Sequence, residues 1–160
     1  MIVRLCKISL VASIALFFIL VAYGNIKDYE TNWVFVKHVL AMDTILSDSP
    51  LKGRAITDPG LVRLAYLSII AWEALTAAIL IVGTARLVLS CRDPRVFARA
   101  KPLAILGLTF GLLLFGLGFT IIGGEYFAMW QSRTWSGLDS ATRFVLLDGV
   151  VLVVLIAPEV

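Results

Sequence analysis

The sequence predicts an all-α fold: a four-transmembrane-helix bundle with an extra amphipathic helix on the outer face, between spans 1 and 2. The first observation is composition: 60% of the 160 residues are hydrophobic and 16% are charged, whereas soluble domains have about 25% charged residues. The second is that the apolar residues form four separate blocks, and a helix needs roughly 20 such residues to cross a bilayer. A chain of this length has room for one compact bundle and no sizeable extramembrane domain, so we expect residues 1–160 to form a single integral membrane domain.

The first expected span covers residues 5–24 and follows a basic start at Arg4 and Lys7. A basic start, an apolar run and small residues at its end are also typical of a cleaved secretory signal. We expect residues 1–24 to be retained, because the apolar run is long for a signal and three further spans follow it.

Residues 33–46 are expected to form the extra helix, because this segment is too short and too polar to span the membrane. The segment before it, residues 25–30, is polar and predicts a turn. At helical spacing Asp43 falls inside the apolar stripe of the helix, and His38 points away from it. The stripe consists of Trp33, Val36, Val39, Leu40 and Leu46.

The remaining spans are expected at residues 61–86, 102–127 and 140–157. Pro102 is predicted to open the third span, because a proline suits the first turn of a helix, where its missing N–H would have no partner.

Orientation follows from the basic residues. The connector of residues 86–101 holds five Lys or Arg side chains, whereas residues 24–60 hold four alongside five acidic ones. The positive-inside rule places the short basic connector in the cytoplasm. We therefore expect a multi-pass protein of the inner (cytoplasmic) membrane with both termini cytoplasmic. Topology accounts for the basic residues, so nucleic acid is not an expected partner.

Glu73 lies near the middle of the second span and Asp148 near the middle of the last. A charged side chain at that depth costs at least about 2.5–3.5 kcal/mol. Tyr66 and Thr84 lie on nearly the same side of the helix as Glu73, and Thr76 flanks it, so these residues form a polar stripe that should face protein or a water-filled cavity. Two interpretations stay open: a proton, ion or quinone-headgroup site, or a protonated carboxyl making an interhelical hydrogen bond worth roughly 1 kcal/mol.

A second candidate cluster lies on the outer-face helix and contains Asn32, Trp33, His38 and Asp43. His38 and Asp43 are five residues apart, whereas two ligands on one helix face need a spacing of three or four. The chain has one histidine and no CxxC pair, so we expect a structural hydrogen-bonded cluster and no metal site.

Three glycines of the third span, Gly107, Gly111 and Gly118, fall on one helix face. Small residues at this spacing let helix backbones approach closely, which predicts helix packing.

The chain resembles a bacterial family of predicted small integral membrane proteins whose function is unassigned. Two motifs carry the resemblance, Asn32-Trp33-x-Phe35-Val36-x-His38-Val39-Leu40-x-Met42-Asp43-Thr44 and Ala71-Trp72-Glu73. Membership implies a four-span protein of the bacterial inner membrane, and it implies no reaction, cofactor or catalytic residue.

For function, the sequence favours a non-catalytic packing or accessory module within a homo-oligomer or a larger membrane complex. The alternative is a protein that handles protons, ions or quinones with the intramembrane carboxyls Glu73 and Asp148. No catalytic residue is assigned, and the sequence identifies no cofactor. The lipid bilayer is the one partner that the composition requires.

Overall fold

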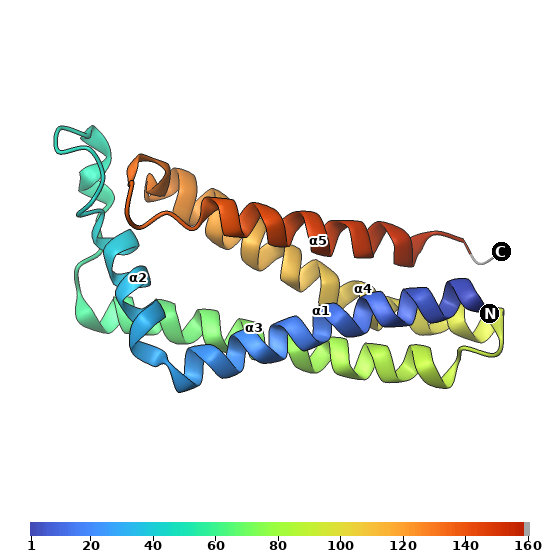
Figure 1. Ribbon diagram of the computed structural model, residues 1–160. Coiled ribbons are helices and arrows are strands. Elements are labelled where there is room, and N and C mark those ends of the chain that lie inside the picture. The colour runs from blue at the N-terminus through green and yellow to red at the C-terminus, as the bar shows by residue number, and fades with distance from the viewer. Residues whose placement is uncertain (159–160) are drawn as a thin grey trace.

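A computed structural model describes residues 1–158, and every regular element in that range is helical. Long helical rods lie side by side, and a shorter helix, α2, crosses one end of the bundle (Figure 1). The rods are α1 (Ile2–Lys27), α3 (Pro59–Leu89), α4 (Pro94–Leu112) with its π-helical continuation η2 (Leu113–Tyr126), and α5 (Leu138–Ile156); α2 covers Tyr29–Ala41. Two short 3-10 turns, η1 (Pro50–Arg54) and η3 (Met129–Gln131), lie in the connecting loops.

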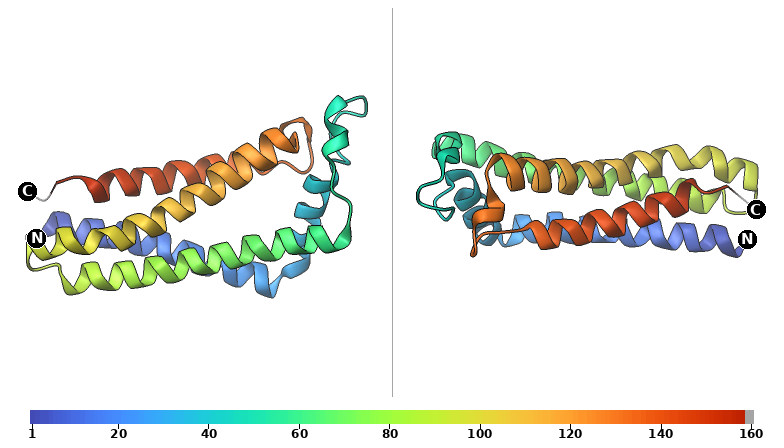
Figure 2. Two further views of the ribbon diagram at one scale, coloured as in Figure 1. Left: turned by 180° about the vertical axis from the view of Figure 1, so that it is seen from behind. Right: turned by 90° about the horizontal axis from the view of Figure 1, so that it is seen from above.

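The two ends of the bundle differ. The start of α1, the end of α5 and the connection from α3 to α4 lie at one end, which we call the terminal end; α2 lies at the other, which we call the α2 end (Figures 1 and 2). At the terminal end, the ammonium groups of Lys7 and Lys101 both donate hydrogen bonds to the carbonyl oxygen of Ala157, at 2.7 and 2.9 Å. They thus satisfy a carbonyl at the C-terminus of α5, where positive charge also complements the helix dipole.

Three helices are long and apolar enough to cross a membrane: Ile2–Lys27, Pro59–Leu89 and the continuous helix Pro94–Tyr126. The predicted fourth span coincides with α5, a helix of 19 residues. Every stretch of 18 residues in α5 contains three charged residues, Asp139, Arg143 and Asp148, whereas each of the other three helices has an apolar stretch of that length with two or fewer. A fourth span therefore stays a prediction.

The core lies between the rods, and α3 packs closely against α4. A Cβ built on Gly83 would lie 2.9 Å from the backbone of Ala104, so only glycine permits this separation of the two helices. One apolar cluster contains residues from α1, α3, α4, η2 and α5. Few polar side chains are buried in this packed core. Two of them, the carboxyls of Glu73 and Asp148, mark the candidate sites.

Helix α4 begins at Pro94, so the prediction that Pro102 opens the third span is wrong. The side chain of Asp93 caps the helix by accepting hydrogen bonds from the backbone N–H groups of Arg95 and Val96, at 2.7 and 3.2 Å. A capping aspartate followed by proline is a strong helix start. Pro102 lies inside the helix, and the expected connector of residues 86–101 shrinks to residues 90–93.

The turn predicted at residues 25–30 is confirmed only at Asp28, and the residues on both sides of it are helical. Helix α1 runs through Lys27 and α2 starts at Tyr29, which leaves Asp28 as the single residue between them. The helical course of α1 is retained because Asn25 is buried and hydrogen-bonded inside the bundle.

The extra helix covers residues 29–41 in place of the expected 33–46. It ends where Met42 adopts a left-handed conformation with φ of 49°. As a result Leu46 lies beyond the helix with 58% of its surface exposed, and Asp43 is exposed as well, so neither belongs to the buried stripe.

Candidate functional site

The candidate site is built around Glu73, whose side chain is only 2% exposed in the middle of α3. The side-chain amide of Asn25, in α1, donates a hydrogen bond to Glu73 Oε2 at 2.7 Å. The side-chain amide of Asn32, in α2, donates in turn to Asn25 Oδ1. A hydrogen-bonded chain therefore connects three helices and ends at the buried carboxyl.

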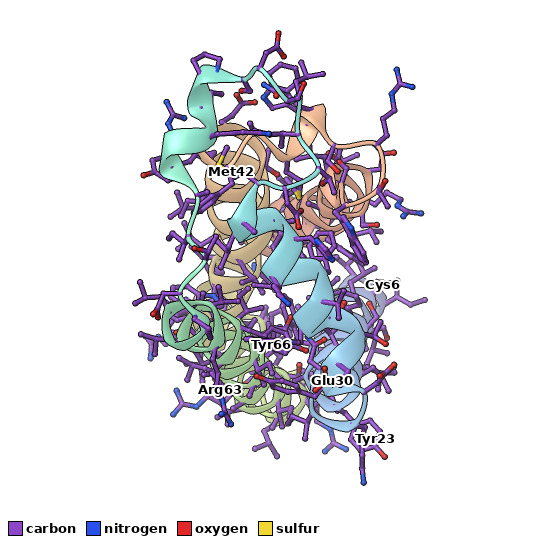
Figure 3. All side chains as sticks on the ribbon, turned by 90° about the vertical axis from the view of Figure 1, so that its left-hand side faces the viewer. Cys6, Tyr23, Glu30, Met42, Arg63 and Tyr66 are labelled. Atoms are coloured by element: carbon purple, nitrogen blue, oxygen red, sulfur yellow. The ribbon has the colours of Figure 1, made fainter. Side chains whose placement is uncertain are left out.

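Tyr66 of α3 completes this polar group. Its hydroxyl donates to the backbone carbonyl of Asn25 at 3.4 Å, and its ring packs against those of Tyr29 and Trp33 with centroid separations of 4.7 and 6.1 Å. Figure 3 shows α2 crossing this end of the bundle, from Glu30 near its start to Met42 beyond its end, with Tyr66 alongside. The aromatic contacts hold α2 against α3, so α2 covers the site.

A cavity of about 310 Å³ lies beside the hydrogen-bonded chain. Its volume falls at the lower limit of those that bind small molecules, about 300–1,000 Å³. One part of its wall is polar and another is formed by phenylalanine rings. The polar part consists of Asn25, Asn32, Tyr66, Glu73, Ser136 and Ser140; the rings belong to Phe17, Phe35, Phe115, Phe119 and Phe144.

Thr76 does not take part in this site, although it shares a helix face with Glu73. Its hydroxyl donates to the carbonyl oxygen of Trp72 at 2.8 Å, within α3 itself. The hydroxyl is therefore satisfied locally, and the polar stripe predicted along α3 reaches the site only through Tyr66 and Glu73.

Asp148 occupies a different place from Glu73. Its side chain is 3% exposed, and among residues 1–158 neither carboxyl oxygen has a hydrogen-bond partner. It packs against Gly111 of α4 and lines a second cavity of about 220 Å³. This cavity shares three wall residues with the first, Phe17, Phe115 and Phe144, which therefore lie between the two carboxyls.

The predicted outer-face cluster divides into two parts. Asn32 and Trp33 join the Glu73 site. His38 and Asp43 form a separate pair, with Nδ1 and Oδ2 2.7 Å apart, and the imidazole stacks on Trp135 at a centroid distance of 4.7 Å. The left-handed residue Met42 turns the chain back, so a spacing of five that would separate two side chains on a continuous helix brings these together.

No group of three or more His, Cys, Asp or Glu side chains that could hold a metal ion occurs in residues 1–158. The His38–Asp43 pair lies at the surface, with relative side-chain exposures of 30% and 46%, and lines neither of the two cavities described above. We interpret the pair as a contact that fastens the end of α2 to the loop containing Trp135.

The three glycines of the third span differ in their surroundings. A Cβ on Gly107 would meet Leu80 at 2.7 Å, and one on Gly111 would meet Asp148 and Phe18. A Cβ on Gly118 would meet no atom closer than 4.0 Å. The π-helical geometry that starts at Leu113 changes the rotation per residue, so Gly118 leaves the face that it would share with the others on an α-helix.

Sequence reasoning missed Asn25, the direct partner of Glu73, because the turn predicted at residues 25–30 removed it from the first helix. One signal was present in the sequence. Asn25 and Asn32 are seven residues apart, a spacing that returns to the same side of a helix, although here Asp28 interrupts the helix between them.

Comparison with known proteins gives one family. Residues 3–158 match a family model described as "Predicted small integral membrane protein (DUF2165)". No curated protein and no solved structure matches the chain significantly.

Proposed function

The chain belongs to the DUF2165 family of predicted small integral membrane proteins, and from the geometry of its site we propose that it binds the headgroup of a lipid-soluble quinone beside Glu73. The observation that carries this proposal is the position of the Glu73 carboxyl. Asn25 holds it in the wall of a cavity whose other surfaces include five phenylalanine rings.

The chemistry of the cavity suits a planar headgroup with carbonyl oxygens. Phenylalanine rings stack on planar rings in offset or tilted arrangements. The hydroxyl groups of Ser136 and Ser140 supply donors near the cavity wall, and a protonated Glu73 would supply another. Glu73 can also exchange a proton with the ligand, since a positioned carboxyl serves as acid or base.

The proposed topology is a four-span protein of the bacterial inner membrane with both termini in the cytoplasm. The terminal end holds the start of α1, the end of α5 and the short α3–α4 connection (Figure 1). Basic side chains flank that connection at Arg86, Arg92, Arg95, Arg99 and Lys101. With this end inside, the positive-inside rule is satisfied, and α2 covers the Glu73 cavity on the outer face.

Two features support α5 as the fourth span. Its 19 residues are close to the length that crosses a hydrocarbon core. Asp148, the charged residue nearest its middle, is buried inside the bundle, so lipid would not contact it.

The test measures how tightly decylubiquinone binds to the purified protein in lipid nanodiscs. The quenching of tryptophan fluorescence reports the binding. Glu73→Gln should weaken binding by about tenfold, the effect of losing one good polar contact to a buried group. Asp148→Asn, the matched change at the other buried carboxyl, should leave the affinity unchanged. Equal affinities of the original protein and Glu73→Gln would refute the proposal.

The second candidate function is the packing or accessory module. A shallow apolar groove of about 380 Å³ runs along α5 and offers a surface for another membrane helix. It is lined by Val145, Leu146, Gly149, Val150, Val153 and Val154.

Blue-native electrophoresis of membranes dissolved in mild detergent tests this candidate. The accessory function predicts a species larger than the monomer. Gly149→Leu should reduce the amount of this species, because the larger side chain fills the groove. A lone monomer in every mild detergent would exclude the candidate.

A further inference from the structure

We propose that the cavity beside Asp148 is a second, separate binding site, and that its ligand is a lipophilic organic monocation such as a substituted ammonium. The proposal does not depend on quinone binding at Glu73. It starts from a carboxyl group that is 3% exposed and has no hydrogen-bond partner on either oxygen within residues 1–158.

An ionised carboxylate in such a place is costly. Removing an ion from water into a protein interior costs several kcal/mol unless a partner compensates for the lost hydration. The wall of the cavity includes no lysine or arginine, and the one basic side chain of α5, Arg143, donates a hydrogen bond to Ser140. A bound cation would supply the missing partner.

The walls of the cavity indicate the kind of cation. Four phenylalanines, Phe17, Phe18, Phe115 and Phe144, line it together with Asp148. Aromatic rings attract a cation that lies over their faces, and such surroundings are typical of sites for substituted ammonium groups. Neighbouring rings in this group have centroids 4.4 to 6.0 Å apart, so they form one continuous aromatic surface.

A metal ion fits this cavity poorly. Its oxygen-bearing side chains are those of Asp148 and Ser13, whereas Ca²⁺ takes six to eight oxygen ligands and Mg²⁺ requires an octahedron. The Ser13 hydroxyl also donates to the carbonyl of Leu10 at 2.7 Å. An organic cation needs one counter-charge and an apolar enclosure, and this cavity supplies both.

Access from the bilayer is open. Ser13 of α1 and Leu147 of α5 both line the cavity, and both are exposed on the outside of the bundle. The cavity therefore opens between these two helices toward the surface that faces lipid in the proposed topology. A cation with apolar substituents dissolves in the bilayer interface and reaches this opening laterally.

Gly111 is part of the site, because a Cβ there would lie 2.1 Å from Asp148 Oδ2. Because glycine has no side chain, the carboxyl of Asp148 can pack directly against α4 at this position. The site thus depends on residues from α1, α4, η2 and α5, and α3 contributes no lining residue. By contrast, α3 supplies Glu73 to the first cavity, so the two sites can be changed independently.

The experiment is equilibrium dialysis of radiolabelled benzyltrimethylammonium against the full-length protein in phosphatidylcholine nanodiscs, with empty nanodiscs as the blank. We expect saturable binding of one cation per chain. Asp148→Asn should abolish saturable binding or weaken it at least about tenfold, and it should fold well, since it removes a buried charge. Glu73→Gln should bind the cation like the original protein.

Two further measurements separate charge recognition from simple apolar binding. Phe18→Leu, a change confined to the second cavity, should weaken binding by about fivefold, the range expected for one cation–π contact. Neopentylbenzene, the uncharged isostere in which carbon replaces nitrogen, should show no saturable binding. The proposal is overturned if Asp148→Asn binds like the original protein, if the neutral isostere binds equally well, or if binding is never saturable.

Discussion

Gly111 is the residue at which three helices meet, since Phe18 of α1 and Asp148 of α5 both approach it on α4. A side chain at this position has no free space. A Cβ would lie 2.1 Å from the carboxyl of Asp148 and 2.9 Å from the ring of Phe18.

Gly111→Ala should therefore lower the free energy of unfolding by about 1–3 kcal/mol, the usual cost of overpacking. Gly116→Ala is the matched control, because a Cβ there meets nothing within 4 Å. That change should be neutral or stabilise the helix by up to about 1 kcal/mol. Unfolding midpoints in detergent give both values, and equal effects of the two substitutions would contradict the packing at Gly111.

The hydrogen bond between Asn25 and Glu73 is a second feature at the scale of the residue. Both side chains are buried, and the amide of Asn25 donates to the carboxyl of Glu73. Asn25→Ala leaves the Glu73 carboxyl without its donor, and we expect a loss of about 1–3 kcal/mol in the free energy of unfolding. A double-mutant cycle with Glu73→Leu measures the coupling. The cost of Asn25→Ala should fall by at least about 0.5 kcal/mol when residue 73 is already apolar; strict additivity would show that the two side chains do not interact.

At the scale of the element, α5 depends on contacts at its C-terminal end. Lys7 and Lys101 are buried, with 2% and 7% exposed, and both ammonium groups reach the carbonyl of Ala157. Hydrogen bonds to charged groups contribute about 1.5–3 kcal/mol each in favourable cases.

Replacing both lysines, Lys7→Met with Lys101→Met, should loosen the end of α5 and lower the unfolding midpoint. Methionine keeps much of the apolar length of lysine and removes the ammonium group with all of its polar contacts. Lys52→Met in the exposed turn η1 is the control and should have no effect. Amide hydrogen exchange near residues 152–157 should rise in the double variant alone, and unchanged protection there would argue against this anchoring.

The π-helical segment η2 changes which way the side chains of the third rod face. Gly107 and Gly111 precede it and face neighbouring helices, whereas Gly118 lies within it and faces a cavity of about 220 Å³. Segments of π-helix are frequent at functional sites. Here the segment brings Phe115 and Phe119 to the wall of the Glu73 cavity.

At the scale of the molecule, the arrangement of the two ends makes a topological prediction. The start of α1 and the end of α5 share the terminal end, and η1 lies beyond α2 at the opposite end (Figure 2). A green fluorescent protein fused to the C-terminus should fluoresce in bacterial cells, because it would stay in the cytoplasm. Alkaline phosphatase inserted after Gly53 should be active, because that turn would face the periplasm. The reverse pattern of activities would invert the proposed orientation.

The sequence alone determined the properties that depend on one segment at a time. Apolar blocks predicted four spans, and three of them coincide with helices long and apolar enough to cross a membrane, since the length and hydropathy of a helix are local quantities. The isolated carboxyls Glu73 and Asp148 were visible for the same reason, because a charged residue is anomalous in any apolar run.

The tertiary structure decided how those segments pair. It placed Asn25 against Glu73, left Asp148 without a hydrogen-bond partner in residues 1–158 and gave each carboxyl its own cavity. These features arise where residues from different helices converge. Hydropathy and helical periodicity describe one helix and carry no information about its neighbours. They therefore identify polar side chains in an apolar helix, but they do not predict which side chains are in contact.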